Sequence, residues 1–214
     1  MSAREEILKR IRRGLVDIPA GELPQDVPVA RDYAKGGDPP AGSADAVALL
    51  AERLADYGAS VRVVSPQDAV AAVADALSVR GATRLVVPQG FPQEWYEASD
   101  AVEILRDEPP LPVGELDAAD GVITTAATAI AATGTLVLDG GPGQGRRALT
   151  LVPDLHLCLV RADQVVASVP EALARLDPIR PLTFISGPSA TSDIELDRVE
   201  GVHGPRTLEV VLIR

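Results

Sequence analysis

The chain has 214 residues, enough for one domain with a sizeable core, and its apolar share of 46% against 24% charged residues is typical of globular proteins. Only 3% of its residues are aromatic and its formal net charge is −11, which argues against a nucleic-acid-binding protein. The single cysteine, Cys158, excludes an intrachain disulfide and a self-contained iron–sulfur cluster, which takes about four thiolates. No apolar run is long enough for a membrane span and no secretory signal is present, so we expect a cytoplasmic protein.

The N-terminal part of the chain predicts a helix followed by an extended arm. Residues 3–15 place apolar side chains on one helical face, namely Ile7, Leu8, Ile11 and Leu15. The prolines and glycines between Pro19 and Gly42 predict an extended segment. We therefore divide the chain into an N-terminal helix and proline-rich arm, residues 1–42, and an α/β domain, residues 43–214. The basic residues of the helix indicate a solvated face, while its apolar stripe must pack on the domain or on a partner.

The domain opens with alternating helices and strands. A helix capped by Ser43 precedes a buried strand at residues 61–64, and Ser65 with Pro66 predicts the start of the next helix. Two further strands are expected, at residues 85–87 and 102–105. Strand–helix–strand alternation predicts a parallel sheet with helices on its faces.

After residue 120 the pattern changes to closely spaced strands with little helix between them. The strand candidates are residues 121–130, 134–138, 149–152, 155–160, 182–186 and 207–213. One short helix is expected at residues 170–176. Added to the parallel core, these strands predict a mixed, largely parallel sheet in an α/β fold.

Two glycine-containing segments of this region are candidates for function. The segment from Ala131 to Thr135 enters a strand, where a glycine lets a ligand or another backbone approach closely, or forms a β-bulge. The glycine-rich loop at residues 140–145, followed by Arg146 and Arg147, has groups that could hold an anion. It matches neither nucleotide-binding fingerprint, so we interpret it as a flexible hairpin tip.

A polar segment at residues 186–195 follows a predicted strand. Ser192 and Glu195 predict a capping box for a short helix that ends near Gly201. A helix N-terminus at the carboxyl end of a strand is where open α/β sheets bind anions. Asp193 and Glu195 can equally serve as helix caps that complement the helix dipole.

The two histidines have different surroundings in the sequence. His203 lies between glycines in a loop, where it can titrate, bind a ligand or be satisfied by the backbone, whereas His156 lies in an apolar strand and is expected in the core. Spacing alone assigns no catalytic residue. With so few Cys and His residues we expect no metal site and no cofactor in the chain itself. The candidate ligand-binding residues are Thr133, Gly134, Thr135, Gly187, Ser189, Ser192, Asp193, Glu195, His203 and Gly204.

These motifs resemble those of a known family. Residues 186–195, followed by Gly201-Val202-His203-Gly204-Pro205, closely resemble the C-terminal signature of the lactate utilisation protein C family (LutC/YkgG), a branch of the LUD-domain proteins. The segment from Ala129 to Leu136 resembles the central motif of the family. The N-terminal helix, the arm and the order of elements also fit, so the resemblance covers essentially the whole chain.

The resemblance implies both a fold and a role. The implied fold is a three-layer α/β sandwich like that of the sugar-phosphate isomerase and CoA-transferase (NagB/RpiA-like) superfamily. The implied role is that of an accessory subunit in the oxidation of L-lactate to pyruvate, beside a cysteine-rich partner and an iron–sulfur partner. We expect a small anionic ligand, no nucleic acid and no membrane span.

The chain departs from the family pattern at two positions. Ala127 and Ala132 stand where relatives usually carry acidic residues, so this chain cannot use those carboxylates as base or nucleophile. The departure favours a non-catalytic or ligand-sensing subunit, and the sequence leaves open whether the chain is an enzyme. The alternatives are a stand-alone enzyme acting on a phosphorylated sugar or a CoA thioester, which the implied fold suggests, and a scaffold without a ligand.

Overall fold

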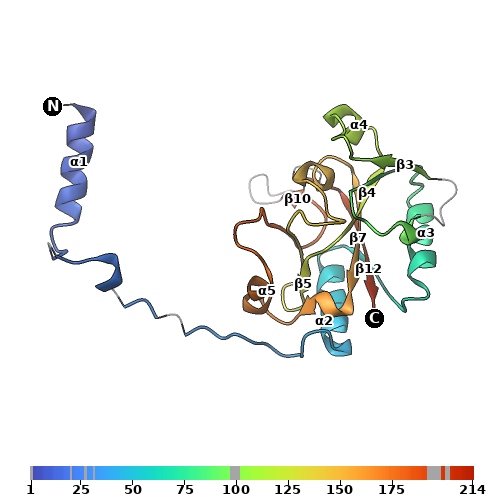
Figure 1. The fold of residues 1–214 in the computed structure, drawn as a ribbon, viewed down its shortest axis with the longest axis horizontal. Coiled ribbons are helices and arrows are strands. Elements are labelled where there is room, and N and C mark those ends of the chain that lie inside the picture. Colours follow the sequence, from blue (N-terminus) through green and yellow to red (C-terminus); the bar gives the residue numbers. More distant parts are fainter. Residues whose placement is uncertain are drawn as a thin grey trace. The chain divides into compact units, whose positions relative to one another are not determined.

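Figure 1 shows the fold as a computed structural model, which describes residues 2–19, 21–26, 28–30, 32–96, 102–191, 199–200 and 203–214. The chain divides into two compact units, Met1–Tyr33 and Ala34–Arg214. No helix in the described ranges has the length and apolar character that crossing a membrane requires.

The N-terminal unit contains the predicted first helix. Helix α1 (Ala3–Gly14) begins with a capping box, in which the Ser2 hydroxyl accepts from the Glu5 N–H and the Glu5 carboxylate accepts from the Ser2 N–H. A short 3-10 helix, η1 (Pro24–Asp26), follows. None of the residues of α1 is buried, and Ile7 and Ile11 are at least half exposed. Within the described residues of its own unit, the apolar stripe of α1 therefore stays largely exposed.

The second unit is built around a six-stranded sheet in which every pairing is parallel. In spatial order its strands are β1 (Ser60–Val64), β12 (Thr207–Ile213), β7 (Leu155–Arg161), β4 (Gly121–Thr125), β2 (Arg84–Val87) and β3 (Glu103–Arg106). The central strands β7 and β12 are buried along almost their whole length, as parallel strands covered on both faces must be.

A second, four-stranded sheet carries the antiparallel pairs. In spatial order its strands are β8 (Val165–Val166), β5 (Thr128–Ile130), β6 (Thr135–Leu138) and β9 (Thr183–Ile185). Strand β5 pairs antiparallel with β6 and parallel with β8, and β6 pairs antiparallel with β9. Two short strands, β10 (Ala190–Thr191) and β11 (Val199–Glu200), pair antiparallel with each other.

Helices and the second sheet cover the two faces of the main sheet. The remaining elements are α2 (Ala44–Asp56), α3 (Ala69–Val79), η2 (Gln93–Trp95), α4 (Val113–Asp117), η3 (Arg147–Thr150), η4 (Ala162–Gln164) and α5 (Val169–Arg175). Leu157 and Leu159 of β7 pack with α3, while Cys158 and Val160 pack with α2 and the second sheet. In Figure 1, α3 lies on one side of β7 and β12, and α2 and β5 lie on the other. The predicted three-layer α/β fold is confirmed.

Residues 121–130 form two strands in different sheets rather than the single strand that we predicted. The N–H of Thr125 donates to the Gly143 carbonyl (2.8 Å), and the N–H of Ala127 donates to the Val137 carbonyl (2.8 Å). The backbone therefore exchanges one set of partners for another between β4 and β5, and the continuous apolar pattern hides this change.

Two other element predictions were wrong in detail. The expected strand at residues 149–152 is the 3-10 helix η3, in which the Leu149 N–H donates to the Arg146 carbonyl (3.0 Å). The helix expected to start at Ser65 starts at Ala69, because the Ser65 hydroxyl bonds the Asp68 carboxylate (2.6 Å) and the Asp68 N–H donates to the Ser65 carbonyl (3.1 Å). Those bonds form a turn in place of the first helical turn.

The last part of the predicted arm is attached to the domain. The N–H of Gly37 donates to Oε1 of Glu171 (2.8 Å), and this bond is the largest cause that lowers the pKa of Glu171. The N–H of Gly42 donates to the Val165 carbonyl (2.9 Å). The division of the chain at residue 43 stays a prediction, and the contacts show that the arm meets the domain before that residue.

Candidate functional site

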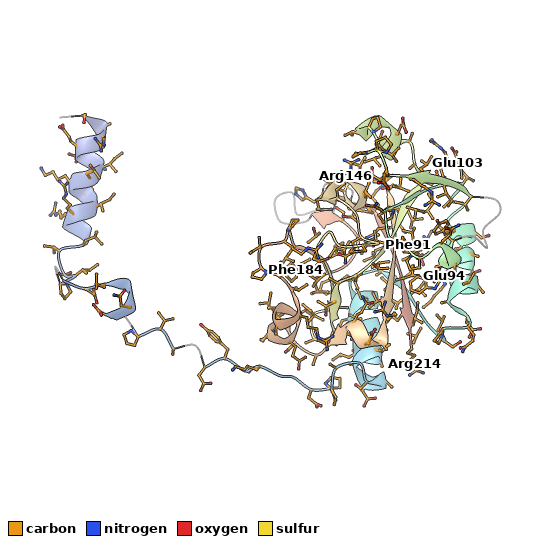
Figure 2. All side chains as sticks on the ribbon, viewed as in Figure 1. Phe91, Glu94, Glu103, Arg146, Phe184 and Arg214 are labelled. Carbon is orange, nitrogen blue, oxygen red and sulfur yellow. The ribbon has the colours of Figure 1, made fainter. Side chains whose placement is uncertain are left out.

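Two neighbouring clefts open on the domain and share the side chains of Arg147 and Thr150. Cleft 1, of about 860 Å³, lies beyond the carboxyl ends of β2, β3 and β6 and includes Pro88, Asp107 and residues 138–142 and 144–147 in its lining. Cleft 2, of about 260 Å³, lies between the main sheet and the loop after β9. In Figure 2, Arg146 marks cleft 1 and Phe184 marks cleft 2.

The glycine-rich loop at residues 140–145 forms a wall of cleft 1. It connects β6 to η3 rather than two paired strands, so its interpretation as a hairpin tip was wrong. The Gly143 N–H donates to the Gln89 carbonyl (2.8 Å), and the Asp139 N–H donates to Oε1 of the buried Gln144 (2.6 Å). At Gly145, with φ +70°, an added Cβ would lie 2.6 Å from Cδ1 of Leu149. The glycines therefore allow close packing of this loop.

The charges of Arg146 and Arg180 in cleft 1 are neutralised within the cleft. Arg146 donates two hydrogen bonds to the Asp107 carboxylate (2.8 and 2.9 Å), and Arg180 donates one to Asp139 (2.8 Å). Burial raises the pKa of Asp107, but the hydrogen bonds from Arg146 and from the Leu111 N–H outweigh it and leave the pKa below its usual value. Cleft 1 is therefore polar, and these two pairs add no net charge to it, so its uncompensated positive charge is that of Arg147, which it shares with cleft 2.

Cleft 2 is where the two C-terminal motifs meet. The Ser189 N–H donates to the Pro205 carbonyl (2.8 Å), and the Ser189 hydroxyl accepts from the His203 N–H (3.0 Å). Gly187 and Gly204 line the same cleft. The loops that carry the candidate residues Gly187, Ser189, His203 and Gly204 converge at this cleft, and whether they bind a ligand stays a prediction.

Arg147 brings a positive charge into cleft 2. Its guanidinium donates to the carbonyl (2.8 Å) and hydroxyl (3.0 Å) of Thr150 and to the His203 carbonyl (3.4 Å). None of these acceptors is charged, and no carboxylate pairs with Arg147 in the part of the chain that the structure describes. Among the described residues, the lining of cleft 2 contains no acidic side chain and consists of Arg147, Thr150, His156, residues 184–189, residues 203–205 and Leu208. The described lining of cleft 2 therefore has a net positive charge in a chain whose formal charge is −11.

His156 lies at the floor of cleft 2. It is 1% exposed, as we predicted for a core residue, and its Nε2 lies 2.7 Å from Oγ1 of Thr124. Burial, together with the charge of Arg147, lowers the pKa of His156 to about 4. Burial also raises the pKa of the neighbouring Cys158 thiol to about 12, so this cysteine is an inert core residue at neutral pH.

The central motif lies behind cleft 2 rather than on it. The Thr135 hydroxyl is 2.7 Å from the Thr133 hydroxyl and 2.8 Å from that of Ser186, which lines the cleft. At Gly134, with φ +58°, an added Cβ would lie 2.7 Å from Cβ and 2.9 Å from the carbonyl carbon of Arg53 in α2. Of the two kinds of close approach that we expected at Gly134, that of another backbone is therefore present. The hydroxyls of Thr133 and Thr135 can orient Ser186.

Three candidate residues, Ser192, Asp193 and Glu195, lie outside the described residues. The helix that we predicted from them to Gly201 does not include Val199–Glu200, which form strand β11. The assumption that this segment begins at an open parallel edge was also wrong, because β9, which precedes it, pairs antiparallel with β6 in the second sheet. Among the described residues, no group of three or more His, Cys, Asp or Glu side chains could hold a metal ion.

Sequence reasoning did not include Arg147 and His156 among the candidate ligand-binding residues. His156 has the apolar neighbours of a core residue, and it is one, but it also reaches a cleft. Arg147 was noted beside the glycine-rich loop, yet its contact with His203, 56 positions away, has no local signal in the sequence.

Comparison with known proteins gives consistent matches. A family model described as the LUD domain matches residues 114–213. A protein of Deinococcus radiodurans named "Lactate utilization protein C" is 45% identical over 99% of this chain and 95% of its own length. A protein of the same name from Bacillus pumilus is 36% identical over 39% of this chain and 38% of its own length.

A solved structure also matches. The crystal structure of a DUF162 family protein from Deinococcus radiodurans has a TM-score of 0.68 and 41% identity, covering 80% of this chain and 98% of that one. The alignment with the full-length Deinococcus relative includes the N-terminal unit as well as the domain.

Proposed function

Because this chain belongs to the lactate utilization protein C family of LUD-domain proteins, we propose that it takes part in the oxidation of L-lactate to pyruvate. In this proposal the chain is a cytoplasmic accessory subunit that binds a small anion in cleft 2 and docks to redox partners. The names of its relatives support the pathway. The charge of cleft 2 supports the anion.

The single observation that carries the anion site is the charge balance of cleft 2. Arg147 brings a guanidinium to a cleft whose described lining has no acidic residue, together with the hydroxyls of Thr150, Ser186 and Ser189. A carboxylate on this guanidinium would make charge-assisted hydrogen bonds, which are roughly twice as strong as neutral ones.

Electron transfer requires partners in this proposal. The chain has one cysteine, Cys158, which is buried and has a pKa of about 12, so it can neither assemble a cluster nor react as a thiolate. Oxidation of lactate releases two electrons, which must pass to a group on another subunit. We therefore assign the redox groups to a cysteine-rich and an iron–sulfur partner.

Helix α1 is the docking element that we propose for these partners. Ile7, Ile11 and Leu15 are each 50% exposed or more, and Arg10, Arg12 and other basic residues surround them. The capping box of Ser2 and Glu5 and the Glu6–Arg10 ion pair are local, so the helix does not need the domain to form them. An apolar groove with an acidic rim on a partner subunit would complement this helix.

Purification of the native complex tests the proposed role. We expect the wild-type chain to co-purify with iron-containing subunits and lactate-oxidising activity, while the isolated chain is colourless. A variant that lacks residues 1–33 should lose the partners but keep its midpoint of thermal unfolding. Isolated chain that carries iron, or a truncated variant that still binds its partners, would contradict the respective part of the proposal.

Calorimetric titration of the isolated chain tests the anion site. We expect lactate or pyruvate to bind with a dissociation constant of millimolar order or below. If neither acid gives a heat of binding at millimolar concentration, anion binding is contradicted. The docking role would then still be tested by co-purification.

A further inference from the structure

The charge and size of cleft 2 limit the class of anion that it can hold. Among the described residues, Arg147 is the single guanidinium in the lining, and no carboxylate there pairs with its positive charge. One such charge compensates one negative charge, so a monoanion fits better than a phosphate dianion or a dicarboxylate. The volume of about 260 Å³ and the apolar side chains of Ile185 and Leu208 suit a ligand with a short apolar part.

His156 supplies a hydrogen-bonding group at the floor of this cleft. The residue is 99% buried, and with a pKa of about 4 its imidazole is neutral at physiological pH and has one N–H. Its Nε2 is 2.7 Å from Oγ1 of Thr124, which lies in the adjacent strand β4. The other ring nitrogen, Nδ1, has no hydrogen-bond partner within the described ranges.

The surroundings of Thr124 decide which ring nitrogen has the proton. The Thr124 hydroxyl is fully buried, and its hydrogen needs an acceptor there. Two side chains are within reach, the Nε2 of His156 and the thiol of Cys158, and an imidazole nitrogen is a much better acceptor than sulfur. The hydroxyl therefore donates to Nε2, and the proton of the ring stays on Nδ1.

We infer that cleft 2 selects a small monocarboxylate that has a hydroxyl or oxo oxygen on the carbon next to its carboxylate. In this arrangement Arg147 binds the carboxylate, and the Nδ1–H of His156 donates to the neighbouring oxygen. The inference rests on the anion site of the proposed function and adds the class of acid and the residue that recognises it. An acid without the second oxygen leaves a buried N–H unpaired, which is how a site built to hydrogen-bond its ligand rejects an analogue.

Three acids with the same number of carbon atoms separate the contact of Arg147 with the carboxylate from the contact of His156 with the neighbouring oxygen. Calorimetry with pyruvate, lactate and propionate compares ligands that share a three-carbon chain and a carboxylate, while propionate lacks the oxygen on the second carbon. We expect the wild type to bind pyruvate or lactate roughly tenfold more tightly than propionate.

Two variants of His156 separate the ring nitrogens. In His156→Asn the side-chain amide nitrogen replaces Nδ1 and keeps a donor for the ligand, so the preference over propionate should remain. In His156→Gln the amide reaches toward Thr124 instead, so the preference should fall to about one while the affinity for propionate stays the same.

A third variant and a spectroscopic measurement keep the inference testable if both His156 variants unfold. Thr124→Val is close to isosteric and removes the hydroxyl that sets the tautomer, so it should reduce the preference without touching the lining of cleft 2. The ¹⁵N chemical shifts of the His156 ring in the wild type should show a protonated Nδ1.

The possible outcomes distinguish this inference from the proposed function. Equal affinity of the wild type for propionate and pyruvate would overturn the role of His156 and leave the anion site intact. A protonated Nε2, or a preference that His156→Gln does not change, would also overturn it. If none of the three acids binds, the anion site itself fails.

Discussion

Cleft 1 has about 860 Å³ against about 260 Å³ for cleft 2, yet it is the smaller cleft that we propose as the anion site. In cleft 1, Arg146 and Arg180 bind Asp107 and Asp139, so these two guanidinium groups already have a carboxylate, whereas Arg147, which lines both clefts, has none among the described residues. In cleft 2, Arg147 binds carbonyls and a hydroxyl only. The difference between Arg146 and its neighbour Arg147 shows that the number of arginines and the size of a cleft do not predict an anion site. What matters is whether the positive charge is already neutralised.

The largest effect on stability is expected from the buried carboxylate of Glu209. Glu209 of β12 has a 2% exposed side chain and binds Arg62 and Arg80. Removing the carboxylate in Glu209→Gln leaves Arg62 with Asp75 and Arg80 with the Ser60 hydroxyl as partly exposed partners, so we expect the free energy of unfolding to fall by about 1–3 kcal/mol in urea denaturation, the loss of hydrogen bonds to a buried charge. Glu103→Gln is the matched control, because Glu103 is 61% exposed in its pair with Arg84 and should contribute at most about 1 kcal/mol. Equal losses in the two variants would show that burial of the pair is unimportant.

The two neighbouring arginines should differ in binding. Arg147→Gln should weaken pyruvate binding roughly ten- to a hundredfold, since a hydrogen bond to a charged group contributes ~1.5–3 kcal/mol. Arg146→Gln should leave the affinity within about twofold, because its charge is already held by Asp107. Calorimetric titration of both variants measures the contrast, with thermal unfolding as the check that each is folded. A stronger loss in Arg146→Gln would assign the anion to cleft 1.

The Asp107–Arg146 ion pair of cleft 1 should affect the pH dependence of stability rather than the affinity for an anion. The pKa of Asp107 is below its usual value, so its ionised form stabilises the fold above the unfolded pKa of about 3.9, and this stability is lost as pH falls through the folded pKa. Asp107→Asn should therefore be less stable than the wild type by about 1 kcal/mol at pH 7, and the difference should shrink below pH 4. Urea denaturation at pH 7 and pH 3 tests this, and a difference that does not depend on pH would contradict the role of the charge.

The smallest effect is expected at the loop contact of cleft 2. Ser189→Ala removes the acceptor of the His203 N–H, a neutral bond of about 0.5–1.5 kcal/mol. Pyruvate affinity should fall about two- to tenfold, because the His203 carbonyl also positions Arg147. His203→Ala keeps the backbone N–H that donates to Ser189. Any loss of pyruvate affinity in that variant, relative to the wild type, therefore measures the contribution of the imidazole ring alone. An unchanged affinity in Ser189→Ala would show that the loop does not position the site.

The sequence predicted much of the fold because its signals there are local. Ser43 does cap α2, its hydroxyl accepting from the Ala46 N–H, and the apolar run at residues 207–213 does form a buried parallel strand. Residues 61–64 also form a parallel strand, but it is only partly buried, with Val63 42% exposed, so the prediction of a buried strand there was wrong. Another failure occurred where the partner of the backbone is distant. Residues 121–130 look like one strand, because nothing in their composition marks the point at which hydrogen bonding changes from Gly143 to Val137.

The candidate site divides in the same way. The sequence alone established that one cysteine cannot ligate a cluster, and it identified the loops of Ser189 and His203 as candidates. Both conclusions depend on residue type and on the glycines and prolines that mark loops. Only the tertiary structure decided that Arg146 is neutralised by Asp107, 39 positions earlier, while Arg147 reaches His203, 56 positions later. Electrostatic energy depends on distance in space and on burial, and adjacent positions in a sequence specify neither.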